Sequence, residues 1–188
     1  MRHRRADIVD RALDLLGRVG LPDLTMRRLG TELGVQASAI YHHFPNKQAL
    51  LGAVADELMA RGGAVTPSDA EDWEDRVIAL CVATRRALLA YPDGADLVAT
   101  MWAFGLGGNA PYDALHRLLA DAGLADETAD TAARTLLHFV FGHAIGEQAL
   151  DQATRVGAIA PSERAGTGFD AGLALIVAGV REHVDPPQ

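Results

Sequence analysis

Apolar residues recur at helical spacing along almost the whole chain, and alternation with a period of two is nearly absent. In the first segment, Ile8, Leu13 and Leu16 share one face of an amphipathic helix, which Gly20 closes. Thr25 is then a suitable N-cap for a short helix over residues 26–33. The pattern predicts an all-α fold without internal repeats.

Glycine, proline and capping residues divide the rest of the chain into further helices. Gly34 ends the second helix, Phe44-Pro45 ends the third, Asn46 caps the fourth, and Ser68 is placed to cap the fifth. The expected ranges are 37–43, 47–61, 69–90, 95–104, 111–122, 126–154 and 168–184.

Charge is distributed unevenly along the 188 residues, whose net charge is −8. Residues 1–50 hold 8 Lys+Arg and 5 Asp+Glu, a balance of +3, so residues 51–188 hold 17 − 8 = 9 and 25 − 5 = 20, a balance of −11. A small basic head on an acidic body can contact a polyanion although the whole chain is acidic. No apolar run approaches the roughly 18 residues of a membrane span, the N-terminus is not a signal peptide, and Cys81 stands alone, so we expect a cytoplasmic protein without a membrane partner.

The stretch LGVQASAIYHHFPNKQALL, residues 33–51, contains the most informative chemistry. Two short helices joined at Gly34 match the helix-turn-helix plan, in which the second helix enters the major groove of DNA. Small residues over 37–39 allow close approach to base edges, and Gln36 can pair with adenine. Near the end of this helix, Tyr41, His42 and Lys47 are donors suited to phosphates, as are the amides that open the next helix.

Three alternatives to DNA binding remain open for this stretch. A three-helix bundle with a solvated polar face explains the same spacing. A metal site fits poorly, because His42 and His43 point about 100° apart on a helix and no carboxylate or cysteine lies at ligand spacing. Catalysis by Ser38, four residues before His42, would lack an enclosed pocket.

Residues 8–51, IVDRALDLLGRVGLPDLTMRRLGTELGVQASAIYHHFPNKQALL, resemble the DNA-binding head of the TetR family of transcriptional repressors. The segments RRALLAYPDGADLVA, FVFGHAIGEQA and FDAGLALIVAGVRE resemble the body of its tetracycline-repressor branch. The resemblance implies a helix-turn-helix domain over 1–46, a lever helix over 47–63 and a ligand-binding and dimerisation domain over 64–188. Gly52 is then a candidate point of flexure in the lever, or a site of close packing.

The resemblance also implies partners and contact residues. The partners are a palindromic double-stranded DNA operator, a small-molecule effector and a second copy of the chain, bound through the last two long helices. By position, the residues that face bases are Arg27, Gln36, Ala37, Ser38 and Ala39. Those at or near the DNA backbone are Thr25, Tyr41, His42, His43 and Lys47.

The effector pocket departs from that of the tetracycline repressor. Leu80, Thr84 and Val98 occupy the positions of its drug-binding asparagine and phenylalanine and its magnesium-binding histidine, so we expect no metal, no other cofactor and a different, apolar or aromatic effector. The expected lining residues are Leu80, Thr84, Val98, Met101, Trp102, Phe104, His116, His138, Phe139 and Glu147, with Phe141 and His143 nearby. For each of these a plain core or surface role is the alternative, and His138 is expected to be a core histidine.

Two rival functions come from other classes. A small helical enzyme could use His138, His143 and Glu147 in a buried pocket, and a dimerisation module could use only the helical bundle. Neither explains the basic head with its helix-turn-helix pattern, so we expect a DNA-binding regulator, a repressor released by its effector, and not an enzyme.

Overall fold

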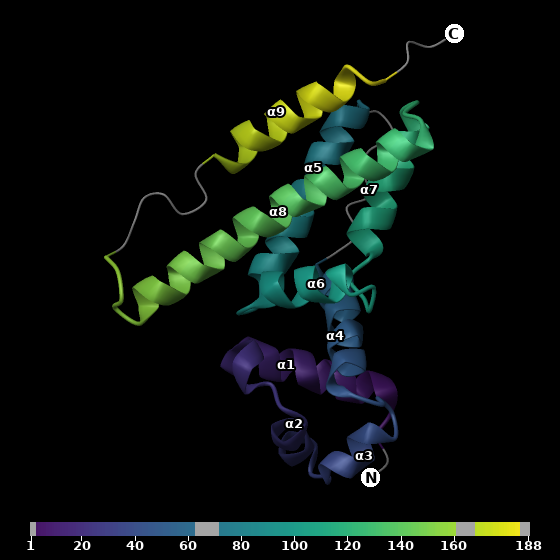
Figure 1. Ribbon diagram of the computed structural model, residues 1–188. Helices are drawn as coiled ribbons and strands as arrows, with labels where there is room; N and C mark the ends of the chain where they lie inside the picture. Colours follow the sequence, from purple (N-terminus) through teal and green to yellow (C-terminus); the bar gives the residue numbers. More distant parts are fainter. Residues whose placement is uncertain (1–2, 63–71, 161–167, 185–188) are drawn as a thin grey trace. The chain divides into compact units, whose positions relative to one another are not determined.

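The computed structural model describes residues 3–62, 72–160 and 168–184, and within these ranges every regular element is a helix (Figure 1). The all-α prediction is therefore confirmed. The helices are α1 Arg5–Asp23, α2 Met26–Leu33, α3 Ala37–Tyr41, α4 Lys47–Arg61, α5 Trp73–Leu89, α6 Gly94–Ala103, α7 Ala110–Asp121, α8 Asp126–Arg155 and α9 Phe169–Arg181.

Local capping sets the limits of the short helices near the N-terminus. Thr25 Oγ1 accepts the Arg28 N–H at 3.1 Å, and Gly34 ends α2 in the left-handed region with φ 67°. Asn46 Oδ1 accepts the Ala49 N–H at 2.8 Å at the start of α4. The predicted ranges of α2 and α4 are confirmed. Gly20, with φ 75° and ψ 176°, interrupts the helical backbone of α1 where the sequence predicted its end.

Two predicted boundaries are wrong, the ends of α3 and α9, and α9 ends at Arg181 and not at residue 184. Helix α3 ends at Tyr41 and not at His43, because the N–H groups of His43 and Phe44 both turn back to the Ile40 carbonyl before Pro45. Helix α5 begins at Trp73, and its expected start at residue 69 lies outside the described residues. The expected cap at Ser68 lies outside the described residues.

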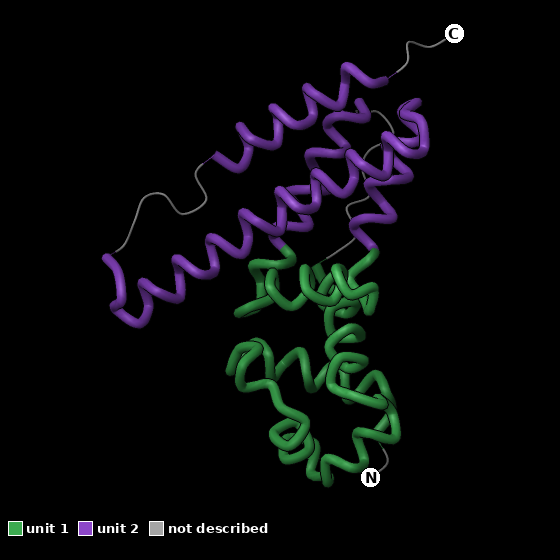
Figure 2. The backbone as a smooth tube through the Cα atoms, in the orientation of Figure 1, with its two compact units in different colours: residues 1–62, 87–109 green, residues 63–86, 110–188 purple. Residues whose placement is uncertain are grey.

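The chain divides into two compact units, residues 1–62 with 87–109 and residues 63–86 with 110–188 (Figure 2). In the first unit, α4 packs against both α1 and α6. Its buried core is apolar and includes Ile8, Leu13, Leu16, Leu24, Leu29, Ile40, Phe44, Leu50, Val54, Leu58 and Leu97. In the second unit, the long helix α8 packs against α7 and α9.

Helix α4 meets the turn after α6 with no side chain between the two backbones. A Cβ added at Gly52 would lie 2.1 Å from the carbonyl oxygen of Leu106, and one added at Gly107 would lie 2.4 Å from the carbonyl oxygen of Gly52. One turn further along α4, the Asp56 carboxylate accepts the Gly108 N–H at 2.7 Å. Gly52 is therefore a site of close packing.

Replacing Gly52 with alanine should destabilise the protein because the new methyl group would collide with the Leu106 carbonyl. We expect a loss of about 1–3 kcal/mol in the free energy of unfolding, measured by denaturant titration. Gly17→Ala in α1 is the matched control, since its Cβ would meet only the Tyr91 ring at an ordinary 3.5 Å. Equal stability of the two variants would contradict the close approach.

Candidate nucleic-acid interface and effector-binding residues

The recognition segment, residues 26–44 with α2 and α3, depends on a close approach between these two helices. A Cβ added at Gly30 would lie 2.8 Å from the Val35 carbonyl oxygen, so a side chain at position 30 would push the two helices apart. The Val35 N–H in turn donates to the Gly30 carbonyl at 2.9 Å. Ile40, fully buried, anchors the underside of α3 in the core. These contacts leave the opposite side of α3 exposed.

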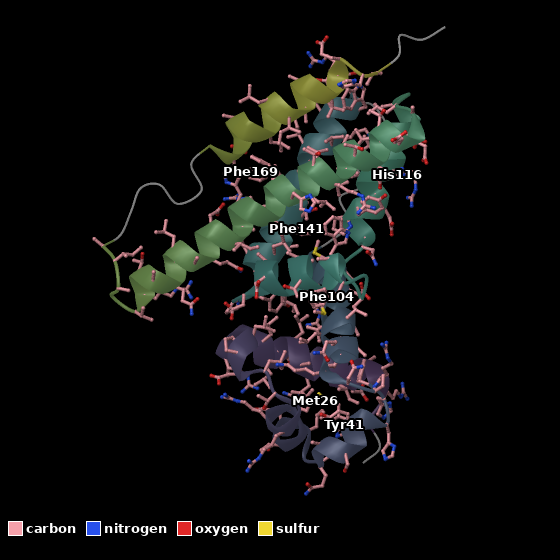
Figure 3. The ribbon with its side chains drawn as sticks, in the orientation of Figure 1. Met26, Tyr41, Phe104, His116, Phe141 and Phe169 are labelled. Carbon is pink, nitrogen blue, oxygen red and sulfur yellow. The ribbon has the colours of Figure 1, made fainter. Side chains whose placement is uncertain are left out.

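The predicted DNA-contacting residues all lie at least partly exposed in this part of the first unit. Thr25, Arg27, Gln36, Ser38, Tyr41 and His42 are exposed, and Ala37, Ala39, His43 and Lys47 are half-buried. Tyr41, at the end of α3, has 48% of its surface exposed (Figure 3). Thr25 already uses its hydroxyl oxygen as the cap of α2, which is compatible with donation of the hydroxyl hydrogen to a phosphate.

Ion pairs divide the cations of the head into two groups. Arg18 contacts Glu32 at 2.7 Å and Arg28 contacts Asp23 at 3.7 Å, so carboxylates partly neutralise both cations. The Arg18 guanidinium also holds the pKa of the Glu32 carboxyl below its ordinary value, through their hydrogen bond. Arg27 and Lys47, in contrast, have no carboxylate within 4.0 Å among the described residues.

The predicted effector-pocket residues divide between the two units. Val98, Met101, Trp102 and Phe104 belong to the first unit, and Leu80, Thr84, His116, His138, Phe139 and Glu147 belong to the second. Val98, Met101 and Thr84 are buried, and the Thr84 hydroxyl donates to the Leu80 carbonyl at 2.8 Å. Phe104 is 64% exposed, and His138 is exposed, so the expectation that His138 is a core histidine is wrong.

In the second unit, Glu147 belongs to an ion pair and aromatic cluster that joins three helices. Its carboxylate accepts from Arg85 Nε at 2.9 Å and Nη2 at 2.5 Å, which joins α8 to α5. The Arg85 guanidinium lies 4.8 Å from the centroid of the Phe169 ring. Figure 3 labels Phe169 at the start of α9. His143 and Phe139 complete the cluster, 5.4 and 5.5 Å from Phe169 between ring centroids. Sequence reasoning missed Arg85, and its position within an apolar helix was the only available signal.

The remaining candidate groups are His116 and Cys81. His116 contacts Asp126 at 3.2 Å and stacks on Tyr112 at 5.8 Å between centroids. Cys81 is fully buried, and burial raises the pKa of its thiol to about 12, so it is not a reactive thiolate. Over the described ranges, no group of three or more His, Cys, Asp or Glu residues could hold a metal ion, and no helix is long and apolar enough to cross a membrane.

Comparison with known proteins gives matches to both parts of the chain. The tetR family of bacterial regulatory proteins matches residues 8–54, and the Tetracyclin repressor-like C-terminal domain matches residues 66–162. Tetracycline repressor protein class C of Escherichia coli is 34% identical over an alignment of 204 residues, and the alignment covers 95% of this chain and 91% of that protein.

Solved structures resemble the chain over nearly its full length. The crystal structure of Mycobacterium smegmatis BioQ has a TM-score of 0.86 with 38% identity and covers 96% of this chain and 99% of that one. BioQ with its double-stranded DNA operator has a TM-score of 0.80 with 36% identity and the same coverage. A TetR variant from Acinetobacter baumannii AYE in complex with minocycline has a TM-score of 0.79 with 29% identity, covering 98% and 99%. The chain therefore belongs to the tetR family of bacterial regulatory proteins, with a body of the Tetracyclin repressor-like type.

Proposed function

We propose that the chain is a homodimeric repressor that binds a palindromic operator and leaves it when a small apolar or aromatic effector binds the body. Family membership makes it a DNA-binding transcriptional repressor and not an enzyme. A bacterial repressor acts on the chromosome, so we place it in the cytoplasm. The observation that carries the proposal is the exposed face of α3, held by Gly30 and Ile40, together with Arg27 and Lys47, which have no carboxylate partner in the described part of the chain.

The roles in DNA binding follow from position and exposure. Base contacts are assigned to Arg27, Gln36, Ala37, Ser38 and Ala39, and backbone contacts to Thr25, Tyr41, His42, His43 and Lys47. The small side chains of α3 allow the helix to lie deep in the major groove. Arg27 is exposed and has no ion pair with a described carboxylate, so its N–H groups are available to a base.

The dimer is assigned to the outer face of α8 and α9. A groove of about 630 Å³ runs along these two helices, and its lining mixes apolar and small polar side chains. Leu175 lies in it with 75% of its surface exposed, beside Ile176 and Val180. A second copy would cover this apolar face and complete a four-helix bundle.

We assign residues 1–46 to DNA binding and residues 47–63 to transmission of the effector signal. Residues 64–188, the body, are assigned to ligand binding and dimerisation. Val98, Met101 and Trp102 supply apolar and aromatic surface from α6, the helix that ends at the turn against Gly52 and Asp56 of α4. An effector that favours a wrong spacing of the two recognition helices must weaken operator binding by reciprocal linkage, since correct spacing is about 34–36 Å.

Selection of bound duplexes from a random pool should enrich a palindrome with half-sites about one helical turn apart. Lys47→Ala and Tyr41→Ala should weaken binding to all duplexes, and Lys47→Ala should also lower its salt dependence, because phosphate contacts carry no sequence information. Arg27→Ala and Gln36→Ala should instead change the enriched sequence. An unchanged palindrome and affinity in all four variants would contradict the assignment.

Trp102→Ala should leave operator affinity unchanged but shift or abolish release by the effector, because the change removes aromatic surface from the proposed pocket. Aromatic small molecules would be screened for release of the selected operator. Trp73→Phe is the control, and since the chain has two tryptophans it also leaves Trp102 as the only one. Quenching of Trp102 fluorescence by a releasing compound is expected, and a normal response in Trp102→Ala would exclude Trp102 from the site.

Leu175→Asp should convert the dimer to monomers and lower operator affinity, because a carboxylate would be buried against the apolar face of the partner. Analytical ultracentrifugation measures the first effect. Val156→Asp is the matched control, since Val156 is 73% exposed at the end of α8 and lies outside the groove. A Leu175→Asp protein that remains dimeric would place the interface elsewhere.

A further inference from the structure

We propose that the N-terminal segment His3–Arg5 is a second DNA-binding element, which holds phosphates of the operator backbone beside the recognition helix. The inference rests on the proposed operator binding and adds a contact outside the helix-turn-helix. It is carried by three observations: the anchoring of His3, the position of Arg5 on Phe44, and the lack of carboxylate partners for Arg4 and Arg5 among the described residues.

The segment is anchored at the helix-turn-helix by a side chain. His3 Nε2 lies 2.9 Å from the carbonyl oxygen of Leu33, the last residue of α2. A carbonyl oxygen only accepts, so Nε2 carries the hydrogen and donates it. His3 also lines a cavity of about 500 Å³ together with Ile8 of α1 and with residues of the recognition segment, which are Ala39, Ile40, His42 and His43. His3 therefore lies beside α3.

An aromatic ring positions the flat face of the Arg5 guanidinium and leaves its N–H groups available to other partners. Its guanidinium carbon lies 4.6 Å from the centroid of the Phe44 ring, and Phe44 is almost fully buried just after α3. A guanidinium stacked in this way uses its flat face, and its N–H groups point outward in the plane. Two such N–H groups match two oxygens of one phosphate.

Arg4 and Arg5 are both exposed, and neither has a carboxylate within 4.0 Å among the described residues. The nearby Asp7 accepts the backbone N–H of Arg4 at 2.7 Å, which commits that carboxylate oxygen to the start of α1. Elsewhere in the same unit, Arg18, Arg28 and Arg61 each contact a carboxylate. The segment thus keeps two uncompensated cations next to the recognition helix, which is the arrangement that a phosphate backbone binds.

The test compares the full-length wild type with the double variant Arg4→Ala/Arg5→Ala on two duplexes of equal length, the selected operator and an unrelated sequence. The affinities for both should fall by the same factor. The slope of log association constant against log salt concentration should become shallower by about 0.9 for each arginine removed from the complex. Arg4→Lys/Arg5→Lys, which keeps both charges, should retain most of the slope.

The matched control is Arg86→Ala/Arg117→Ala, which removes two exposed arginines without carboxylate partners among the described residues, in the second unit. It should leave the slope unchanged. Phosphate ethylation interference identifies the phosphates whose modification prevents binding. In each half-site, the wild type should depend on phosphates that Arg4→Ala/Arg5→Ala does not need. One contrary result is a wild type that selects an operator while Arg4→Ala/Arg5→Ala has the same salt slope as the control variant. That result would overturn this inference and leave the proposed function standing. A wild type that binds no duplex would overturn the proposed function with it.

Discussion

The contact on which the position of α3, the proposed recognition helix, depends is the approach of Gly30 in α2 to the Val35 carbonyl before α3. Helix α3 is five residues long, and a helix of that length is not stable in water by itself. It persists because its one fully buried residue, Ile40, is held in the core and because the turn before it packs directly on α2. A side chain at position 30 would push the two helices apart. The exposed residues of α3 thus owe their position to a buried glycine of α2.

Electrostatics gives a second constraint, because an acidic protein must still bind a polyanion. The head resolves this by pairing some cations internally, as Arg18 does with Glu32, and leaving others at the surface without a carboxylate. Paired arginines contribute little to attraction for phosphate, since their field is partly cancelled. Net charge and even the +3 balance of residues 1–50 are therefore poor guides to binding. The useful quantity is the set of unpaired cations and the face on which they lie.

Local sequence signals predicted most of the fold, and contacts between distant residues account for most of the rest. Thr25, Gly34 and Asn46 act within one turn of their own helices, so their roles could be read from neighbouring residues. The ion pair of Arg85 with Glu147 spans 62 positions, and the bond from Gly108 to Asp56 spans 52. No periodicity signals such pairs. His138 shows the same limit, because a histidine in an apolar helix can face either the core or solvent, and only packing decides.

In the proposed function, the route from effector to DNA runs through the contact of α4 with the turn after α6. Where side chains separate two elements, a small shift can be absorbed by rotation about their bonds. Between Gly52 and residues 106–107 there is only backbone, so a displacement of the turn must move α4 or break the contact. The bond from Gly108 to Asp56 adds a polar attachment one turn away, which resists sliding along the helix. Because α4 begins at Lys47, directly after the recognition segment, a tilt of α4 changes where α3 is presented. The two glycines that pack without side chains therefore couple the turn after α6 directly to α4.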